Sequence, residues 1–174
     1  MGFLIDTCVW IDVERGALAP GDVAAFTRDE PVFLSPVTIA ELKFGAEITV
    51  DPGVRQQRLA GLRRLQNLPL LPIDGNTGEV FGVLAAEIRR AGRHHRYRVQ
   101  DIWLASQAIQ HGYRLLTRNR RDFEDIPGLD LLVIGGLRAV AASMRPPSQP
   151  PPSYEMSHHA RAEWRPRACE SLPP

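Results

Sequence analysis

Phe3-Leu4-Ile5-Asp6-Thr7 is the stretch that decides the fold class, because a short apolar run closed by a carboxylate is typical of a buried strand with a polar end. Three later runs have the same apolar character: residues 32–34, 113–116 and 131–134. Helical patterns separate these runs, so the sequence predicts an α/β domain with a mainly parallel central sheet. Ligands of such domains usually bind at the carboxyl ends of the strands. We expect Asp6 and the turn that begins at Thr117 to meet there.

The helix between the second and third apolar runs has a clear start signal. Ser35 can act as the N-cap, and Pro36 suits the first helical position. Apolar residues surround Glu41 on several faces of this helix, which predicts a buried helix rather than a merely amphipathic one. Earlier in the chain, Asp22 is the expected cap of a helix that runs to about Arg28.

Composition limits the protein class. The chain has 174 residues, of which 44% are hydrophobic and 24% charged, as expected for one globular domain with room for an appendage. We expect residues 1–136 to form the folded domain. Residues 137–174 are rich in proline and predict a disordered tail. The N-terminal residues predict neither a signal peptide nor a membrane span, and Cys8 and Cys169 suggest no disulfide framework, so we expect a cytoplasmic protein.

The formal net charge is +1, so the overall charge does not indicate a nucleic-acid binder. Local charge is more informative, because two segments, residues 89–98 and 118–121, are rich in arginine. They could steer RNA phosphates, contact a protein partner or only confer solubility. We interpret His94 and His95 as part of a solvated loop, and Asp125 as a solvated surface acid.

Four carboxylates lie in or against apolar segments that begin or end a predicted strand or helix: Asp6, Glu41, Asp101 and Asp122. Burying an unpaired carboxylate is costly, so such groups are usually paired or hold a cation. Four acids close together would also repel one another and raise their pKa values, and a cation removes that penalty. Mg²⁺ and Mn²⁺ prefer oxygen ligands, and phosphodiester hydrolysis can use two such ions.

Four motifs follow one another along the chain: Leu4-Ile5-Asp6-Thr7, SPVTIAELKFG at residues 35–45, QDIWLA at 100–105, and TRNRRDF at 117–123. Together they resemble the PIN-domain ribonucleases, specifically the VapC-like toxins of type II toxin-antitoxin systems. The resemblance covers residues 3 to about 134. It implies a three-layer α/β/α fold and a Mg²⁺- or Mn²⁺-dependent endoribonuclease that hydrolyses RNA with a metal-activated water. It further implies a cognate antitoxin as partner and a homodimer.

The same resemblance suggests roles for the acids. Asp6, Glu41 and Asp101 match the first three acids of the family, as catalytic residues and metal ligands. The fourth is Asp122 in forms of the motif like this one, with Asn119 as a possible neutral ligand.

Neighbouring residues are expected to support the acids. Thr7 and Thr117 could orient carboxylates or water, although hydrogen bonding within a turn would explain them equally well. Cys8 occupies a position where the family commonly has Asn or Ser, and Gln100 stands where Asn often precedes the third acid. Hydrogen bonding around the ligands is therefore expected to differ from the family pattern.

Each acid also has a purely structural interpretation. Asp6 and Asp101 could cap the helices that follow them. Glu41 could be paired with an arginine, and Asp122 could form a surface ion pair. At the level of the whole chain, the alternative to a nuclease is a decayed PIN module that binds RNA or an antitoxin without cleavage. A phosphatase with an aspartyl nucleophile is disfavoured, because Cys8 stands where that scheme needs a second aspartate.

Overall fold

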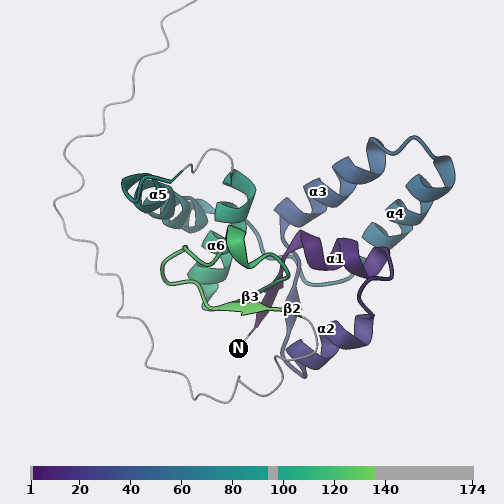
Figure 1. Ribbon diagram of the computed structural model, residues 1–174, viewed down its shortest axis with the longest axis horizontal. Helices are drawn as coiled ribbons and strands as arrows, with labels where there is room; N and C mark the ends of the chain where they lie inside the picture. Colours follow the sequence, from purple (N-terminus) through teal and green to yellow (C-terminus); the bar gives the residue numbers. More distant parts are fainter. Residues whose placement is uncertain (1, 94–97, 136–174) are drawn as a thin grey trace, which may run out of the picture. The chain divides into compact units, whose positions relative to one another are not determined.

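The computed structural model describes residues 2–93 and 98–135 (Figure 1). The predicted tail, residues 137–174, lies outside the described residues, as do His94 and His95. The strands are β1 (Phe3–Ile5), β2 (Val32–Phe33), β3 (Arg114–Thr117) and β4 (Leu131–Val133). They form one sheet in the order β2-β1-β3-β4, and every neighbouring pair is parallel. The predicted parallel sheet is therefore confirmed.

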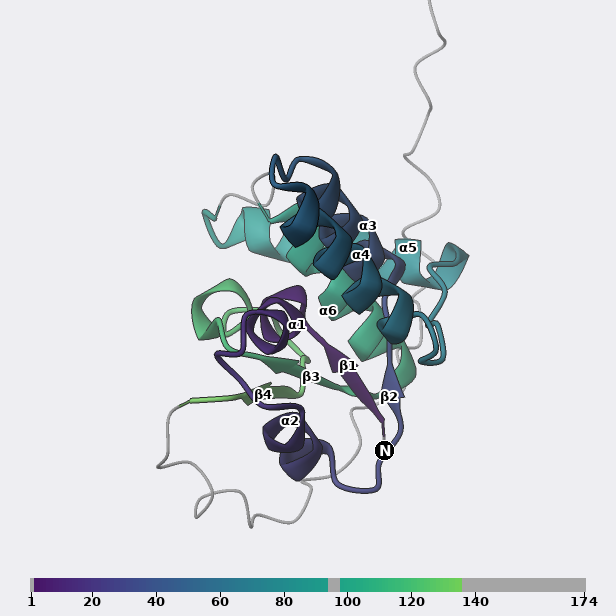
Figure 2. The same cartoon turned by 90° about the vertical axis from the view of Figure 1, so that its right-hand side faces the viewer.

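Helices cover both faces of this sheet. They are α1 (Thr7–Glu14) and α2 (Pro20–Thr27) on one face, and α5 (Gly75–Arg90) and α6 (Val99–His111) on the other. Side chains alternate along β1, so that Phe3 and Ile5 pack towards α1 and α2, whereas Leu4 packs towards α5 and α6. Figures 1 and 2 show α2 and α6 on opposite sides of the sheet. The three-layer α/β/α architecture is confirmed.

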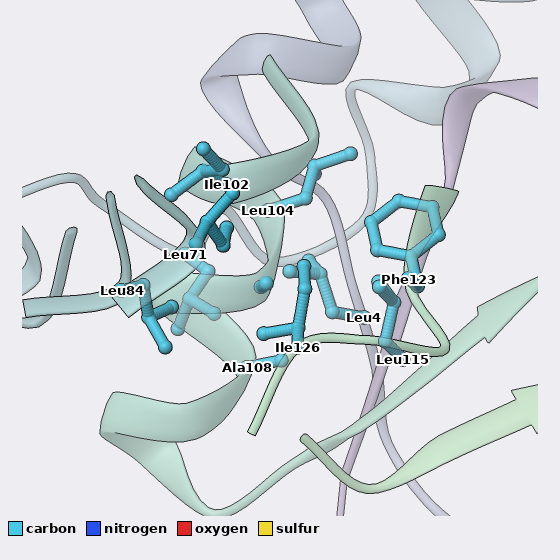
Figure 3. Close-up of a cluster of buried hydrophobic side chains, with 11 residues drawn as sticks. Leu4, Leu71, Leu84, Ile102, Leu104, Ala108, Leu115, Phe123 and Ile126 are labelled. Atoms are coloured by element: carbon cyan, nitrogen blue, oxygen red, sulfur yellow. The ribbon is translucent and has the colours of Figure 1, made fainter. Parts of the chain in front are cut away.

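The hydrophobic core between the sheet and helices α5 and α6 also anchors the turn that precedes β4. Leu4 and Leu115 of the sheet pack there with Leu84 of α5 and several residues of α6 (Figure 3). Phe123 and Ile126 insert into the same cluster and are buried. The 3₁₀ helix η2 (Arg120–Asp122), which ends one residue before Phe123, is therefore tied to the core by its C-terminal flank.

A helical hairpin lies beside the sheet. It consists of α3 (Pro36–Glu47) and α4 (Pro52–Leu65), which pack against each other. The prediction that α3 is buried is wrong for its C-terminal half, because Phe44 is 65% exposed and Ile48, just past the helix end, is 61% exposed. Helix α4 packs against α3 but leaves these two side chains uncovered, so the apolar residues on several faces of α3 are not all shielded.

Start signals predict one helix correctly and misplace another. Ser35 caps α3, with its hydroxyl accepting a hydrogen bond from the Val37 N–H at 3.0 Å. Asp22, the expected cap of α2, lies inside the first turn instead. Pro20 provides the first helical residue, and Asp22 accepts a bond from the Ala19 N–H at 3.0 Å.

Among residues 2–93 and 98–135, no helix is both long and apolar enough to cross a membrane.

Candidate active site

Asp6 lies directly beyond β1, where two side chains hold its carboxylate. The Thr117 hydroxyl donates to Oδ2 at 2.6 Å, and the Cys8 thiol approaches the same oxygen at 2.8 Å. Although Asp6 occupies the N-cap position of α1, its side chain makes no capping hydrogen bond. The capping interpretation is therefore wrong. Asp6 is 7% exposed, and the hydroxyl that donates to it comes from the end of β3, the strand next to β1.

Glu41 lies on α3, and its partner is a hydroxyl rather than an arginine. The Thr7 hydroxyl donates to Glu41 Oε2 and lies 3.3 Å from the Thr38 hydroxyl. Burial raises the pKa of the Glu41 carboxyl, the hydrogen bond from Thr7 lowers it, and the charge of Asp6 raises it. Thr7, the residue after Asp6, is thus linked to the second acid. The alternative of a pairing between Glu41 and an arginine is not observed among the described residues.

Asp101 is the third residue of α6, so it does not cap that helix; the N-cap position belongs to Arg98. Its pKa is raised from the usual 3.8 to about 7. Burial is the largest cause, followed by the negative charges of Asp122 and Asp6, while Arg98 lowers the pKa and Glu41 raises it slightly. The four acids come from separate elements and share one electrostatic environment.

Asp122 ends η2, and its carboxylate accepts a hydrogen bond from the Asn119 side-chain amide. Its backbone carbonyl accepts a bond from Arg98. Within the described part of the chain, no ion pair of the Asp122 side chain replaces these contacts, so the surface ion-pair interpretation is not supported. Asn119 is exposed and serves Asp122 as a donor.

A small hydrogen-bonded network fixes the turn around Asp6. The Thr117 hydroxyl accepts a hydrogen bond from the Asn119 N–H at 2.9 Å and donates one to Asp6, so it acts as both acceptor and donor. The Arg118 N–H points to the Cys8 sulfur at 3.4 Å. Burial, followed by the charge of Asp6, raises the pKa of the Cys8 thiol to about 11. Cys8 therefore stays protonated at neutral pH and can donate to Asp6.

The interpretation of Asp125 as a solvated surface acid is wrong. Its side chain is only 6% exposed. Arg98 donates two hydrogen bonds to the Asp125 carboxylate, from Nη1 at 2.7 Å and from Nη2 at 2.8 Å. These hydrogen bonds lower the pKa of the Asp125 carboxyl to about 2. A signal was present, because Asp125 stands next to the apolar Ile126 and two residues after Phe123. An acid between core residues needs a partner.

The donor set is suited to a hard divalent cation. Asp6, Glu41, Asp101 and Asp122 offer only carboxylate oxygens, which Mg²⁺ and Mn²⁺ prefer. In the residues that the structure describes, no three acid, His or Cys side chains already lie close enough together to hold a metal ion. Burial first, and then the charges of Asp122 and Asp6, raise the pKa of Asp101, and a bound cation would offset both effects. The chemistry of the site fits a cation.

Comparison with known proteins identifies the fold family. The family model described as "PIN domain" matches residues 3–129. A "Ribonuclease VapC" of Rickettsia bellii is 27% identical over 135 residues, which cover 77% of this chain and 97% of the relative. A "Ribonuclease VapC5" of Mycobacterium tuberculosis is 30% identical over 132 residues, 73% of this chain and 87% of the relative.

Two solved structures are similar as well. A VapBC-5 toxin-antitoxin structure from Mycobacterium tuberculosis has a TM-score of 0.59 at 27% identity, over 76% of this chain and 97% of that one. A VapBC2 structure from Rickettsia felis, bound to a DNA fragment, shares the fold, with a TM-score of 0.67 at 20% identity over 78% of this chain and 100% of that one. The chain belongs to the PIN-domain family and, within it, to the VapC group.

Proposed function

We propose that this chain is a metal-dependent endoribonuclease that acts as the toxin of a toxin-antitoxin pair. The observation that carries the proposal is the shared environment of four acids from separate elements, in which burial first, and then the charges of Asp122, Asp6 and Glu41, raise the pKa of Asp101. Its relatives are named as ribonucleases, which supports RNA as the substrate. The nuclease unit would be residues 1–136.

The four carboxylates Asp6, Glu41, Asp101 and Asp122 would hold Mg²⁺ or Mn²⁺. Such a cation supplies Lewis-acid stabilisation of the charge that develops on a phosphodiester during hydrolysis. The protein's part is positioning. Both hydrogen bonds to Asp6 reach Oδ2, which leaves Oδ1 for a cation. Thr7 restrains Glu41 in the same way through Oε2. Asn119 is proposed to orient Asp122 rather than to bind the cation directly.

The test is cleavage of RNA by the purified chain with Mg²⁺ or Mn²⁺. Asp6→Asn and Asp101→Asn should each abolish cleavage, because each removes a charged ligand while it keeps the shape of the side chain. Asp29→Asn, a change of the same kind at an exposed acid, is the matched control and should cleave normally. Equal cleavage by all four proteins would refute the assignment of the site.

A PIN module that binds RNA or an antitoxin without cutting is the second candidate. One observation favours it: among the described residues, three ligands are not yet gathered at metal-binding distances. Calorimetry separates the candidates, because a module without chemistry has no need to bind divalent ions at these acids. Uptake of Mn²⁺ that disappears in Asp101→Asn supports the nuclease.

A protein partner is also proposed. The neighbours described as VapBC are toxin-antitoxin proteins, so we expect a cognate antitoxin that covers the acidic site. The chain offers an uncovered apolar surface for such contact, formed by Phe44, Ile48, Val50 and Val54 near the α3–α4 turn.

An RNA substrate and an antitoxin would place the toxin in the cytoplasm. The expected homodimer is tested by light scattering of the purified chain.

A further inference from the structure

The Arg98–Asp125 ion pair lies at the border of the acidic site. Arg98 is the N-cap residue of α6, three residues before Asp101, and Asp125 follows η2. The guanidinium contacts both carboxylate oxygens of Asp125, at 2.7 and 2.8 Å. Such a two-pronged contact fixes the plane of the guanidinium and uses both of its terminal nitrogens. Arg93 contacts Asp125 from the exposed side.

The same guanidinium is close to Asp101 but forms no hydrogen bond with it. Its Nε lies 4.0 Å from Asp101 Oδ2, which is beyond hydrogen-bond distance. Within the described residues, this Nε is buried and has no hydrogen-bond partner. A buried donor without a partner is costly, so Arg98 would gain from turning towards Asp101. The two hydrogen bonds to Asp125 prevent this rotation of the guanidinium.

The turn around Asp125 does not depend on this ion pair for its position. Phe123 and Ile126, on either side of Asp125, are buried in the core between the sheet and α6 (Figure 3). If the Asp125 charge is removed, we therefore expect the backbone to stay in place. The guanidinium then keeps its bond to the Asp122 backbone carbonyl, while the N–H groups that Asp125 occupied are released and Asp101 is the nearest acid of the site.

We propose that Asp125 is a positioning residue that occupies Arg98 and thereby keeps Asp101 free for the divalent cation. The proposal rests on the metal-dependent nuclease function proposed above. Without Asp125, the guanidinium closes from 4.0 Å to hydrogen-bond distance of Asp101 and competes with the cation for that carboxylate. A purely structural ion pair, which only ties η2 to α6, has no such consequence.

Thermal unfolding in EDTA at pH 7.5 tests the mechanism without metal. In the unaltered background, Asp101→Asn should raise Tm, because it removes a part-buried charge that the neighbouring acids also repel. In an Asp125→Asn background the sign should reverse, because Asp101 now pairs with Arg98 and its loss breaks that pair. Glu124→Gln, which neutralises the adjacent exposed acid, is the matched background and should leave the rise unchanged. The same rise in all three backgrounds would overturn the proposal.

Mn²⁺ binding by calorimetry provides the second measurement. Asp125→Asn should weaken binding about tenfold, in the range usual for residues that orient metal ligands. Adding Arg98→Gln should restore most of the affinity, because the competing guanidinium is gone. A purely structural role predicts that the double variant binds no better than Asp125→Asn, and that result would refute our account. Absence of Mn²⁺ binding by the unaltered protein would refute the proposed function, and the cation part of this proposal with it.

Discussion

Asp101→Asn should make the metal-free protein more stable at neutral pH, and it should flatten the dependence of stability on pH. The folded-state pKa of Asp101 is about 7, against 3.8 for an ordinary aspartate. The folded protein therefore binds this proton more tightly than the unfolded chain does. The stability that comes from the protonated form is complete below about pH 4 and is lost as the pH rises towards 7. Asparagine does not ionise and lacks this loss.

The magnitude follows from the same two pKa values. At about 1.4 kcal/mol for each pH unit, the difference corresponds to roughly 4 kcal/mol for a fully shielded group. The Asp101 side chain is 25% exposed, and solvent screening reduces the effect, so we expect about 1 to 2 kcal/mol. For a domain of this size, that is roughly 3 to 8 °C in Tm.

The assay is thermal unfolding in EDTA at pH 5.5 and pH 8. The unaltered protein should be more stable at pH 5.5, and Asp101→Asn should exceed it at pH 8 but much less at pH 5.5. Asp125, with its pKa near 2, has the opposite sign but contributes only as the pH falls below about 4, outside this range. Equal stability of the two proteins at pH 8 would refute the view that burial and the neighbouring acids together destabilise the Asp101 carboxylate.

Three further predictions concern support and partners. Thr117→Val removes the 2.6 Å hydrogen bond to Asp6 and should lower the rate of RNA cleavage about 10- to 100-fold, whereas Thr117→Ser keeps the hydroxyl and most of the rate; equal rates would contradict a positioning role. Phe44→Ser with Ile48→Ser should leave cleavage intact and weaken co-purification with the antitoxin, and unchanged co-purification would place the antitoxin elsewhere. Deletion of residues 137–174 should leave cleavage unchanged, since the family match ends at residue 129; loss of cleavage in a folded truncated protein would contradict this.

Parallel strands made the neighbourhood of Asp6 predictable. A carboxylate that directly follows β1 and a hydroxyl at the end of β3 must lie at the same edge, because the strands are adjacent and parallel. The sequence also supplied Glu41 and Asp101 as candidates, from their positions in apolar helices. Strand and helix periodicity therefore predicted the parallel sheet and the meeting of Asp6 with the Thr117 turn, whereas the three layers and the ligand roles of the four acids were implied by the family resemblance.

Long-range contacts were harder to predict. The burial of Asp125 depends on Arg98, which is 27 residues away in the sequence, and no local pattern pairs the two. The exposure of Phe44 depends on how much of α3 its partner helix covers, which the pattern of α3 alone does not contain. Both errors concern the surroundings of a side chain rather than the secondary structure that carries it.

The central claim is that Asp6, Glu41, Asp101 and Asp122 form one cation site that serves RNA hydrolysis. Titration of the purified chain with Mn²⁺ by calorimetry, beside Asp101→Asn and the exposed control Asp29→Asn, tests it most directly. We expect saturable binding by the unaltered protein and by the control, and no binding by Asp101→Asn. Binding of equal strength by all three proteins, or no binding by the unaltered chain, would contradict it.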